Sequence, residues 1–333
     1  MTPPSTRSSD PPLVRAIQVV TTTGPADIEV RKISEPTPGP NDVLVEVHSV
    51  GVSFPDLLLT RGEYHLKPQL PFSLGVDFAG VVISGGGYAP GDRVAGVGSW
   101  GGAAEIVANP ADSTFALPDL MSFDEGAALP LNYLTAQFAL RVRGDISEGE
   151  TVLVHGAAGG VGTATLQVAR GYGARAIAVV STEQKAQIAR DAGADEVVMV
   201  EGFKDAVEDI TDGRGVDIIM DVVGGDIFTD SLRSLGANGR LLVVGFAAGQ
   251  GIPEVKVNRL LLNNTDVRGV GWGTYAPARP GFMRKQWAEL EPMIASGVVK
   301  PVVGATYDLD GFKQALVDID ERRALGKSVV RLR

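Results

Sequence analysis

The stretch that decides the fold is Thr151-Val-Leu-Val-His-Gly-Ala-Ala-Gly-Gly-Val-Gly162. A short apolar strand pattern leads into a turn with glycines at 156, 159, 160 and 162, although Ala157 stands where the Gly-x-Gly-x-x-Gly pattern has its first glycine. Glycines let the backbone approach a pyrophosphate, and a following helix offers free N–H groups and its positive dipole end. We therefore predict a dinucleotide site whose cofactor contacts come from Gly156, Ala157, Ala158, Gly159, Gly160, Val161 and Gly162. The alternative is a turn that only packs a helix on a sheet.

The residues after this turn alternate between short apolar runs and helical segments. The predicted strands are 151–155, 175–181, 196–200, 216–221, 240–245 and 266–271. Such alternation is typical of a parallel sheet with right-handed crossovers, and apolar runs without a period of two indicate strands covered on both faces. We expect an α/β, doubly wound Rossmann sheet.

The flanking segments predict a second, mainly β domain. Residues 14–116 are rich in turn residues, and 42–50 alternate with a period of two, which predicts a half-buried strand. A helical pattern covers 122–142, and the chain ends in two short helices with extended segments after each. Residues 1–13, rich in Pro, Ser and Thr, are expected to form a disordered tail.

The composition bounds the function. The 333 residues suggest two domains, and 44% hydrophobic with 21% charged residues is typical of a globular protein. A net charge of −10 argues against nucleic-acid binding. The sequence contains no stretch of 18 apolar residues, so we predict no membrane span. The absence of cysteine excludes disulfides, thiolate nucleophiles and Cys-ligated metal, and is compatible with the cytoplasm, where we expect the protein.

The end of the second predicted strand favours NADPH over NADH. NAD sites place Asp or Glu there to bind the ribose 2′-hydroxyl, but this chain has Ser181 and Thr182, with Lys185 following. Hydroxyls and an ammonium suit a 2′-phosphate. Two observations leave the question open: Lys185 can also be an ordinary exposed helix lysine, and the acidic Glu183 lies close by.

Further stretches carry a resemblance to a known family. They are Gly51-Val-Ser-Phe-Pro-Asp56, Leu74-Gly-Val-Asp-Phe-Ala-Gly80, Pro130-Leu-Asn-Tyr-Leu-Thr-Ala136 and Asp221-Val-Val-Gly-Gly225. With the glycine turn, they resemble the zinc-independent quinone oxidoreductase (zeta-crystallin-like) branch of the medium-chain dehydrogenase/reductase superfamily. The resemblance implies a GroES-like catalytic domain from 14–135 and 276–333, a Rossmann NADP-binding domain from 136–275, and a cleft between them. It also implies a homodimer, formed through the sheet edge at 266–271.

The resemblance also implies that no metal is used. Zinc-dependent relatives carry Cys at the position of Ser53 and His-Glu where this chain has Val76-Asp77. Serine and valine cannot replace a thiolate and an imidazole on zinc, so zinc-polarised alcohol dehydrogenase chemistry is excluded. Many members of the quinone branch have Asn where Ser53 stands, so hydrogen bonding in this cleft can differ.

Several cofactor residues follow from the resemblance alone. It places Thr135 near the nicotinamide, and it places Val222, Gly245, Phe246 and Trp272 along the cofactor and the cleft. Arg323 matches an arginine that helps to hold the 2′-phosphate in relatives. Arg322 is adjacent, and a shift of one position between the two stays open.

The expected reaction is hydride transfer from NADPH to a quinone. The resulting hydroquinone anion is stabilised by its ring, so the protein mainly has to hold donor and acceptor together in a partly dry cleft. The candidate cleft residues are Ser53, Tyr64 and Asn132; Tyr64 can equally be a packing residue, and Asn132 can brace a helix start near the cofactor. Two alternatives stay open: reduction of an activated C=C bond, in an enone or enoyl thioester, and a non-catalytic, crystallin-like NADPH-binding protein.

Overall fold

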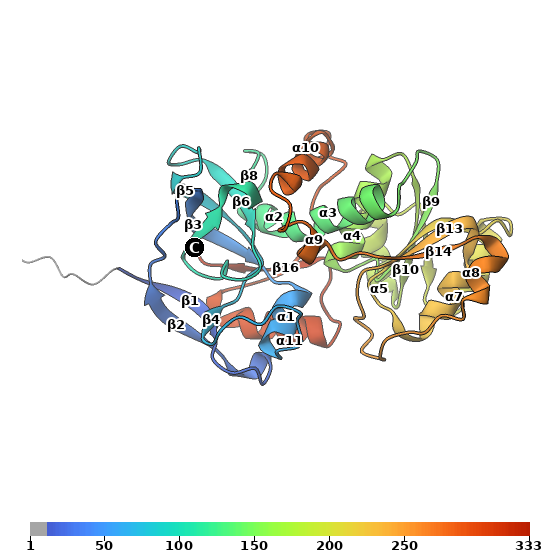
Figure 1. The fold of residues 1–333 in the computed structure, drawn as a ribbon, viewed down its shortest axis with the longest axis horizontal. Coiled ribbons are helices and arrows are strands. Elements are labelled where there is room, and N and C mark those ends of the chain that lie inside the picture. The colour runs from blue at the N-terminus through green and yellow to red at the C-terminus, as the bar shows by residue number, and fades with distance from the viewer. Residues whose placement is uncertain (1–11) are drawn as a thin grey trace, which may run out of the picture.

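The computed structural model describes residues 12–333 and has two lobes that lie side by side (Figure 1). One lobe, the β lobe, combines strands from both ends of the chain, and the other, the Rossmann lobe, is built from its middle. The expected tail falls outside the described residues as far as residue 11. Its last residue, Leu13, already begins a strand, because it pairs with Ser34.

The Rossmann lobe is a six-stranded parallel sheet in the order β11-β10-β9-β12-β13-β14. Its strands are β9 (Thr151–His155), β10 (Arg175–Val180), β11 (Glu196–Met199), β12 (Val216–Asp221), β13 (Leu235–Val243) and β14 (Asp266–Gly269). Its helices are α4 (Gly160–Gly171), α5 (Glu183–Asp191), α6 (Phe203–Ile210), η4 (Gly225–Ile227), α7 (Phe228–Arg233), α8 (Asn258–Asn263) and α9 (Trp272–Tyr275). The strand order reverses between β9 and β12, which makes this the doubly wound arrangement and sets its crevice at that point.

Both faces of this sheet are buried, which explains the apolar runs. In β9, Val152 and Val154 belong to a cluster on one face, while Leu153 packs on the other face with Phe203 and Val207 of α6. The strand β13 begins at Leu235, earlier than the predicted 240. The Gly-Ala-Asn-Gly segment after Leu235 has the composition of a turn, but its backbone stays in the strand as an irregularity between β12 and β13.

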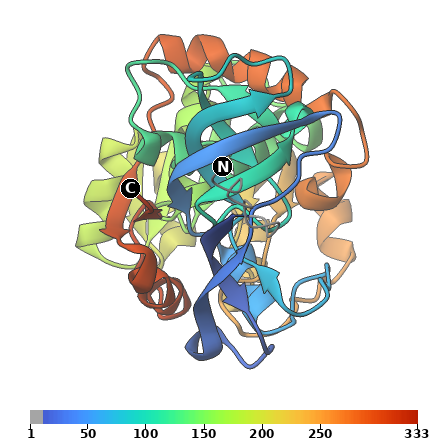
Figure 2. The ribbon, with the colours of Figure 1, turned by 90° about the vertical axis from the view of Figure 1, so that its left-hand side faces the viewer.

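The β lobe contains two sheets. Its strands are β1 (Leu13–Val19), β2 (Ile28–Ser34), β3 (Asp42–Gly51), β4 (Phe72–Ser73), β5 (Asp77–Gly85), β6 (Arg93–Val97), β7 (Ile106–Pro110), β8 (Thr114–Ala116), β15 (Val303–Tyr307) and β16 (Lys327–Arg331). The sheets are β2-β1-β4 and β15-β16-β3-β5-β6-β8, with β7 also paired to β3. As predicted, Val43, Val45 and Val47 of β3 are buried, whereas Glu46 and His48 are half-buried. Figure 2, which faces this lobe, shows the red C-terminal segments beside the blue N-terminal strands.

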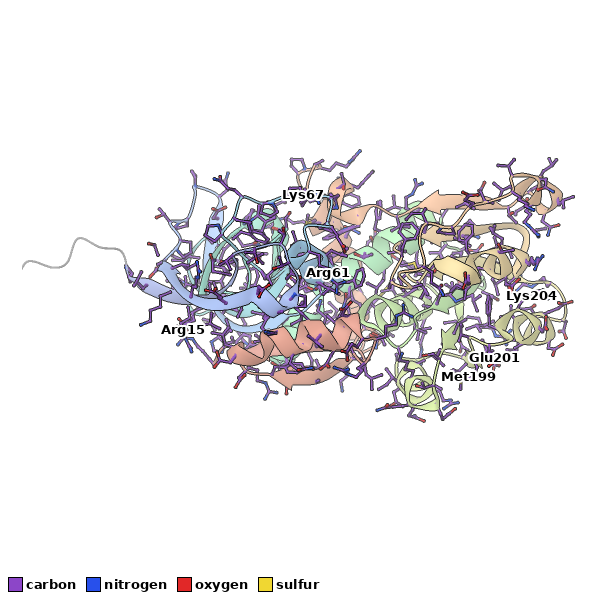
Figure 3. The ribbon with its side chains drawn as sticks, turned by 90° about the horizontal axis from the view of Figure 1, so that it is seen from below. Arg15, Arg61, Lys67, Met199, Glu201 and Lys204 are labelled. Carbon is purple, nitrogen blue, oxygen red and sulfur yellow. The ribbon has the colours of Figure 1, made fainter. Side chains whose placement is uncertain are left out.

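Short helices complete the β lobe and join it to the Rossmann lobe. Those of the β lobe are η1 (Pro25–Asp27), α1 (Phe54–Thr60), η2 (Ala111–Ser113), η5 (Leu309–Gly311) and α11 (Phe312–Asp320). Arg61, which directly follows α1 and is labelled in Figure 3, pairs with Asp320 at the end of α11 at 2.5 Å, and this ion pair joins segments far apart in sequence. Between the lobes lie α2 (Phe123–Ala128), α3 (Pro130–Gln137), η3 (Phe138–Arg143) and α10 (Phe282–Ala295).

The predicted helical stretch 122–142 is divided into three segments. Ser122 caps α2, and Glu125 completes the cap by accepting from the Ser122 N–H at 2.8 Å. A second helix begins at Pro130, which has no N–H to donate and therefore favours the first position of a helix. Among the described residues, no helix is both long enough and apolar enough to cross a membrane.

Candidate active site

The glycine turn, residues 156–162 and hereafter the phosphate turn, lies where β9 ends and α4 begins. A Cβ atom on Gly159 would meet only the Gly156 carbonyl oxygen, at 3.4 Å, among the described residues. A Cβ atom on Gly162 would lie 2.2 Å from the same oxygen and 2.7 Å from Ala157 Cα. The turn is thus open in front of the α4 N-terminus and closely packed behind it, an arrangement that fits a bound pyrophosphate.

The ends of β12 and β13 border the same crevice. Asp221 Oδ1 accepts from the N–H groups of Val223 and Gly224, both at 2.8 Å, while its buried Oδ2 has no partner among the described residues. Burial raises the pKa of this carboxyl. A Cβ atom on Gly156 would lie 2.8 Å from Val222, and in the described part of the chain one on Gly245 would meet only the Val222 carbonyl oxygen. Next to Gly245, Phe246 is partly exposed.

The polar groups expected for the 2′-phosphate lie together at the end of β10. Thr182 caps α5 by accepting from the Lys185 N–H at 3.3 Å, and the Lys185 ammonium donates to Ser181 Oγ at 3.1 Å. Partial burial and the nearby Arg322 guanidinium both lower the pKa of Lys185. The acidic Glu183 instead forms an ion pair with Arg190 at 2.7 Å.

The arginine beside Lys185 is Arg322, not Arg323. The Arg323 guanidinium is paired with the carboxylates of Asp318 and Glu321. Arg322 has a left-handed backbone with φ of 57° and donates to the carbonyl of Ala248. Of the two positions that the resemblance left open, only Arg322 adds its charge to that of Lys185, whereas Arg323 is paired at its own helix end.

On the other side of the crevice, the β lobe supplies Ser53, the N-cap of α1. Ser53 Oγ lies 2.6 Å from the ammonium of Lys327 and 3.3 Å from Asp77 Oδ2. Lys327 and Asp77 form an ion pair at 2.5 Å, and all three side chains are buried. Burial raises the pKa of Asp77, against the opposing effect of the Lys327 charge. Lys327 was not among the predicted site residues, and its only signal in the sequence is a charge at the start of an apolar terminal strand.

A second buried carboxyl, Asp56, lies beside this group. It accepts from the backbone N–H groups of Ser53 and Gly75, both at 2.9 Å, and burial raises its pKa to about 7. Burial, and then the Asp56 charge, raise the pKa of Tyr64. The Tyr64 hydroxyl lies 3.1 Å from the position that a Cβ atom would occupy if Gly273 of the Rossmann lobe carried one. Tyr64 therefore packs on the hydrophobic core of the β lobe and also reaches Gly273 of the Rossmann lobe with its hydroxyl.

Three further predicted residues lie between the lobes. The Asn132 amide nitrogen lies 2.5 Å from the position that a Cβ atom on Gly160 would occupy, so Asn132 packs against the phosphate turn. Thr135 is buried on the same helix, α3. Trp272 is only 5% exposed and its indole donates to Gln286 Oε1 at 2.8 Å. Its side chain therefore belongs to the core, which leaves only its backbone for a cofactor contact.

The residues around Ser53 do not fit a zinc ion. Neither Ser53 nor Val76 is a zinc ligand of the usual kind, and the nearby Asp77 is held by an ammonium at 2.5 Å. In the described part of the chain, no group of three or more His, Cys, Asp or Glu side chains could hold a metal ion.

Comparisons with known proteins match segments of both lobes. Residues 39–119 match the alcohol dehydrogenase GroES-like domain, and residues 160–296 match the zinc-binding dehydrogenase family. The chain is 36% identical over 313 residues to quinone oxidoreductase-like protein 2 of Rattus norvegicus, covering 92% of this chain and 89% of that protein.

Solved structures are similar over nearly the whole chain. The quinone oxidoreductase of Thermus thermophilus, solved alone and in complex with NADPH, is 31% identical with a TM-score of 0.83, covering 96% of this chain and 100% of that one. The CurK enoyl reductase is 25% identical with a TM-score of 0.86, covering 96% and 99%.

Proposed function

The chain belongs to the zinc-independent, quinone oxidoreductase-like branch of the medium-chain dehydrogenase/reductase family, and from this premise we propose that it transfers hydride from NADPH to a quinone without a metal ion. The observation that carries the proposal is the open phosphate turn after β9, together with the charges of Lys185 and Arg322 at the end of the neighbouring strand β10. Two neighbouring cations favour a dianionic 2′-phosphate, and the pairing of Glu183 with Arg190 reduces the opposing charge.

The residues have separate tasks in this proposal. When bound, NADPH supplies a hydride from nicotinamide C4. The phosphate turn and the α4 N-terminus hold the pyrophosphate, and Ser181, Thr182, Lys185 and Arg322 hold the ribose phosphate. Thr135, Val222, Gly245 and Phe246 border the cofactor. Ser53 and Tyr64 face the acceptor from the β lobe, and the contact of Tyr64 with the Rossmann lobe reduces access of water.

Reduction of an activated C=C bond is the second candidate, supported by the similarity to the CurK enoyl reductase. The same hydride donor and the same cleft serve both reactions. A non-catalytic, crystallin-like role in NADPH binding is the third candidate, and it predicts binding without turnover.

An acceptor panel separates the three candidates. Purified protein is mixed with NADPH and, in separate reactions, with 1,4-benzoquinone, a naphthoquinone, cyclohexenone or crotonyl-CoA, and loss of the nicotinamide absorbance is followed. We expect the highest kcat/KM with a quinone. A preference for cyclohexenone or crotonyl-CoA would replace the quinone proposal with the second candidate, and saturable NADPH binding without oxidation of NADPH would support the third.

Assembly and location complete the proposal. We propose a homodimer through the free edge of β14, supported by the exposed apolar side chains of Val257, Leu261 and Leu262 in the preceding segment. A cytoplasmic location accords with the absence of cysteine.

A further inference from the structure

A buried ammonium lies beside Ser53, one of the residues proposed to meet the acceptor. Lys327 is 4% exposed, and its Nζ donates to Asp77 Oδ2 at 2.5 Å and to Ser53 Oγ at 2.6 Å. We call Ser53, Asp77 and Lys327 the buried cluster. Lysine is rarely buried, because the free energy lost when its ammonium leaves water can exceed the attraction of its ionic partner. Replacing a buried ion pair by two apolar side chains often leaves the stability of the fold unchanged. Stability alone is therefore a weak reason for this charge.

The hydrogen bonds of the cluster leave one donor loosely held. An ammonium can only donate, so the Ser53 oxygen accepts from Lys327. The Ser53 hydroxyl hydrogen then has Asp77 Oδ2 as its partner at 3.3 Å, which is longer than the 2.5–3.0 Å usual for O–H···O bonds. Asp77 Oδ2 is also occupied by the shorter bond from Lys327. The Ser53 hydroxyl is thus polarised by a cation and available to a better acceptor.

Two contacts join the buried cluster to the phosphate turn. The N–H of Gly326, next to Lys327, donates to the Ala158 carbonyl at 2.8 Å. Asp77 Oδ1 accepts from the N–H of Leu131 at 2.8 Å, and the following residue, Asn132, packs on Gly160. Ser53 is therefore held from both sides against the segment that binds the cofactor.

We propose that Lys327 is a positioning residue for the reaction: its ammonium fixes and polarises the Ser53 hydroxyl, which donates to the carbonyl oxygen of the acceptor. This inference rests on the proposed function and requires an acceptor with a carbonyl oxygen conjugated to the reacting centre, which quinones, enones and enoyl thioesters all have. Negative charge develops on that oxygen as hydride adds, and a preoriented donor stabilises it there. The serine keeps its proton, and the product anion is protonated later by water.

A set of variants tests the charge while keeping the cluster neutral. Removing Lys327 alone would strand a buried carboxylate, so Lys327→Met is combined with Asp77→Asn, whose amide can still accept from Leu131. We expect Ser53→Ala and the double variant each to lower kcat for the quinone roughly ten- to a hundredfold, with KM for NADPH within about twofold. The triple variant, which combines Ser53→Ala with Lys327→Met and Asp77→Asn, should lose no more kcat than Ser53→Ala alone. The reason is that the serine change and the lysine–aspartate change affect the same hydrogen bond to the acceptor.

A matched control exists on the same strand. Arg331 pairs with Asp124 at 2.6 Å, and Asp124 also accepts from Ser49 Oγ at 2.6 Å, so this group repeats the chemistry of the buried cluster at the surface. The variant Arg331→Met/Asp124→Asn should keep the parent kcat. If Lys327→Met/Asp77→Asn also keeps the parent kcat and only melts at a lower temperature, Lys327 is structural and the inference is wrong. Additive losses in the triple variant would overturn it as well.

A second measurement needs neither turnover nor removal of the ion pair. Because the chain has no cysteine, Ser53→Cys creates a single thiol whose ionisation is followed by thiolate absorbance. A neighbouring ammonium lowers a thiol pKa, whereas burial and carboxylates raise it. We expect a pKa below the usual value of about 8.5. A pKa above that value would contradict polarisation by Lys327, whereas failure of the acceptor panel with a low thiol pKa would count against the proposed reaction and not against the cluster.

Discussion

The N–H of Gly326 donates to the carbonyl of Ala158 at 2.8 Å and so fastens the last strand of the β lobe to the phosphate turn of the Rossmann lobe. Gly326 also forms a parallel bridge with Gly159. The next residue, Lys327, holds Ser53. Two consecutive residues near the C-terminus therefore contact both the cofactor side and the acceptor side of the cleft.

Gly326→Ala should weaken NADPH binding and lower the melting temperature. Gly326 has φ of 63°, and a Cβ there would lie 2.3 Å from the Val302 carbonyl oxygen, so the backbone has to move away from the turn. We expect a loss of stability of about 1–3 kcal/mol. Gly297→Ala is the control: its φ is 76° but its Cβ would have no neighbour within 4 Å among the described residues, so NADPH affinity should stay at the parent value. Equal NADPH affinity in both variants would show that the contact with Ala158 does not matter for binding.

Lys185→Ala and Arg322→Ala should each weaken NADPH selectively. Each removes one charge-assisted contact to the 2′-phosphate, which corresponds to about 1–2 kcal/mol, while NADH lacks that group and should bind as before. Arg323→Ala is the matched control, because its guanidinium is already paired with Asp318 and Glu321. Fluorescence titrations with both cofactors measure the effect. A larger loss in Arg323→Ala than in Arg322→Ala would restore the assignment carried by the resemblance.

Activity should survive exhaustive chelation. The positions of Ser53 and Val76 offer no zinc ligand of the usual kind, and Lys327 occupies the neighbouring carboxylate. The measurement is NADPH oxidation before and after dialysis against a chelator, together with the metal content of the protein. Stoichiometric zinc that is lost together with activity would overturn this prediction.

The sequence predicted the Rossmann sheet well because each strand is short, apolar and separated by a helix, a pattern that few other folds produce. The free edge at β14 also agrees with the prediction. The division of 122–142 into three segments was not anticipated, because its apolar pattern continues across Pro130.

The acceptor side was predicted less completely than the cofactor side. Asp77 is 250 residues from Lys327 and 24 residues from Ser53 in the sequence. The three residues meet because β16 pairs with β3 and β3 pairs with β5. Periodicity cannot show such a contact. Likewise, the cofactor contacts predicted for Trp272 and Arg323 came from the resemblance alone. A resemblance gives the position of a residue in the chain, but it does not show that Trp272 bonds to Gln286 or that Arg323 pairs with Asp318.

Sedimentation should show a dimer at micromolar concentration. Leu261 and Leu262 are each 76% exposed in the chain as described, next to the unpaired edge of β14. Leu261→Glu should place a charge in the apolar interface and shift the protein towards the monomer. Leu120→Glu is the control, since Leu120 is 99% exposed but lies in the β lobe, and it should leave the dimer intact. A monomeric parent would contradict the proposed assembly.

Two glycines of the phosphate turn, Gly159 and Gly162, should respond differently to the same substitution. A side chain at Gly159 would project into open space, since within residues 12–333 its Cβ would meet only the Gly156 carbonyl oxygen, at 3.4 Å. That space is where the pyrophosphate is proposed to lie. A side chain at Gly162 would instead collide with the Gly156 carbonyl oxygen at 2.2 Å and with the Ala157 backbone, between helix and strand.

Gly159→Val should therefore abolish NADPH binding while the melting temperature stays close to that of the parent. Gly162→Val should first lower the melting temperature, because separating α4 from β9 costs about 1–3 kcal/mol or more, and cofactor affinity should fall as a consequence. Each variant is examined by a thermal melt beside an NADPH titration. If Gly159→Val binds NADPH like the parent, the phosphate turn is not the pyrophosphate site. If Gly162→Val melts like the parent, the close packing of α4 on β9 is not what requires glycine at that position.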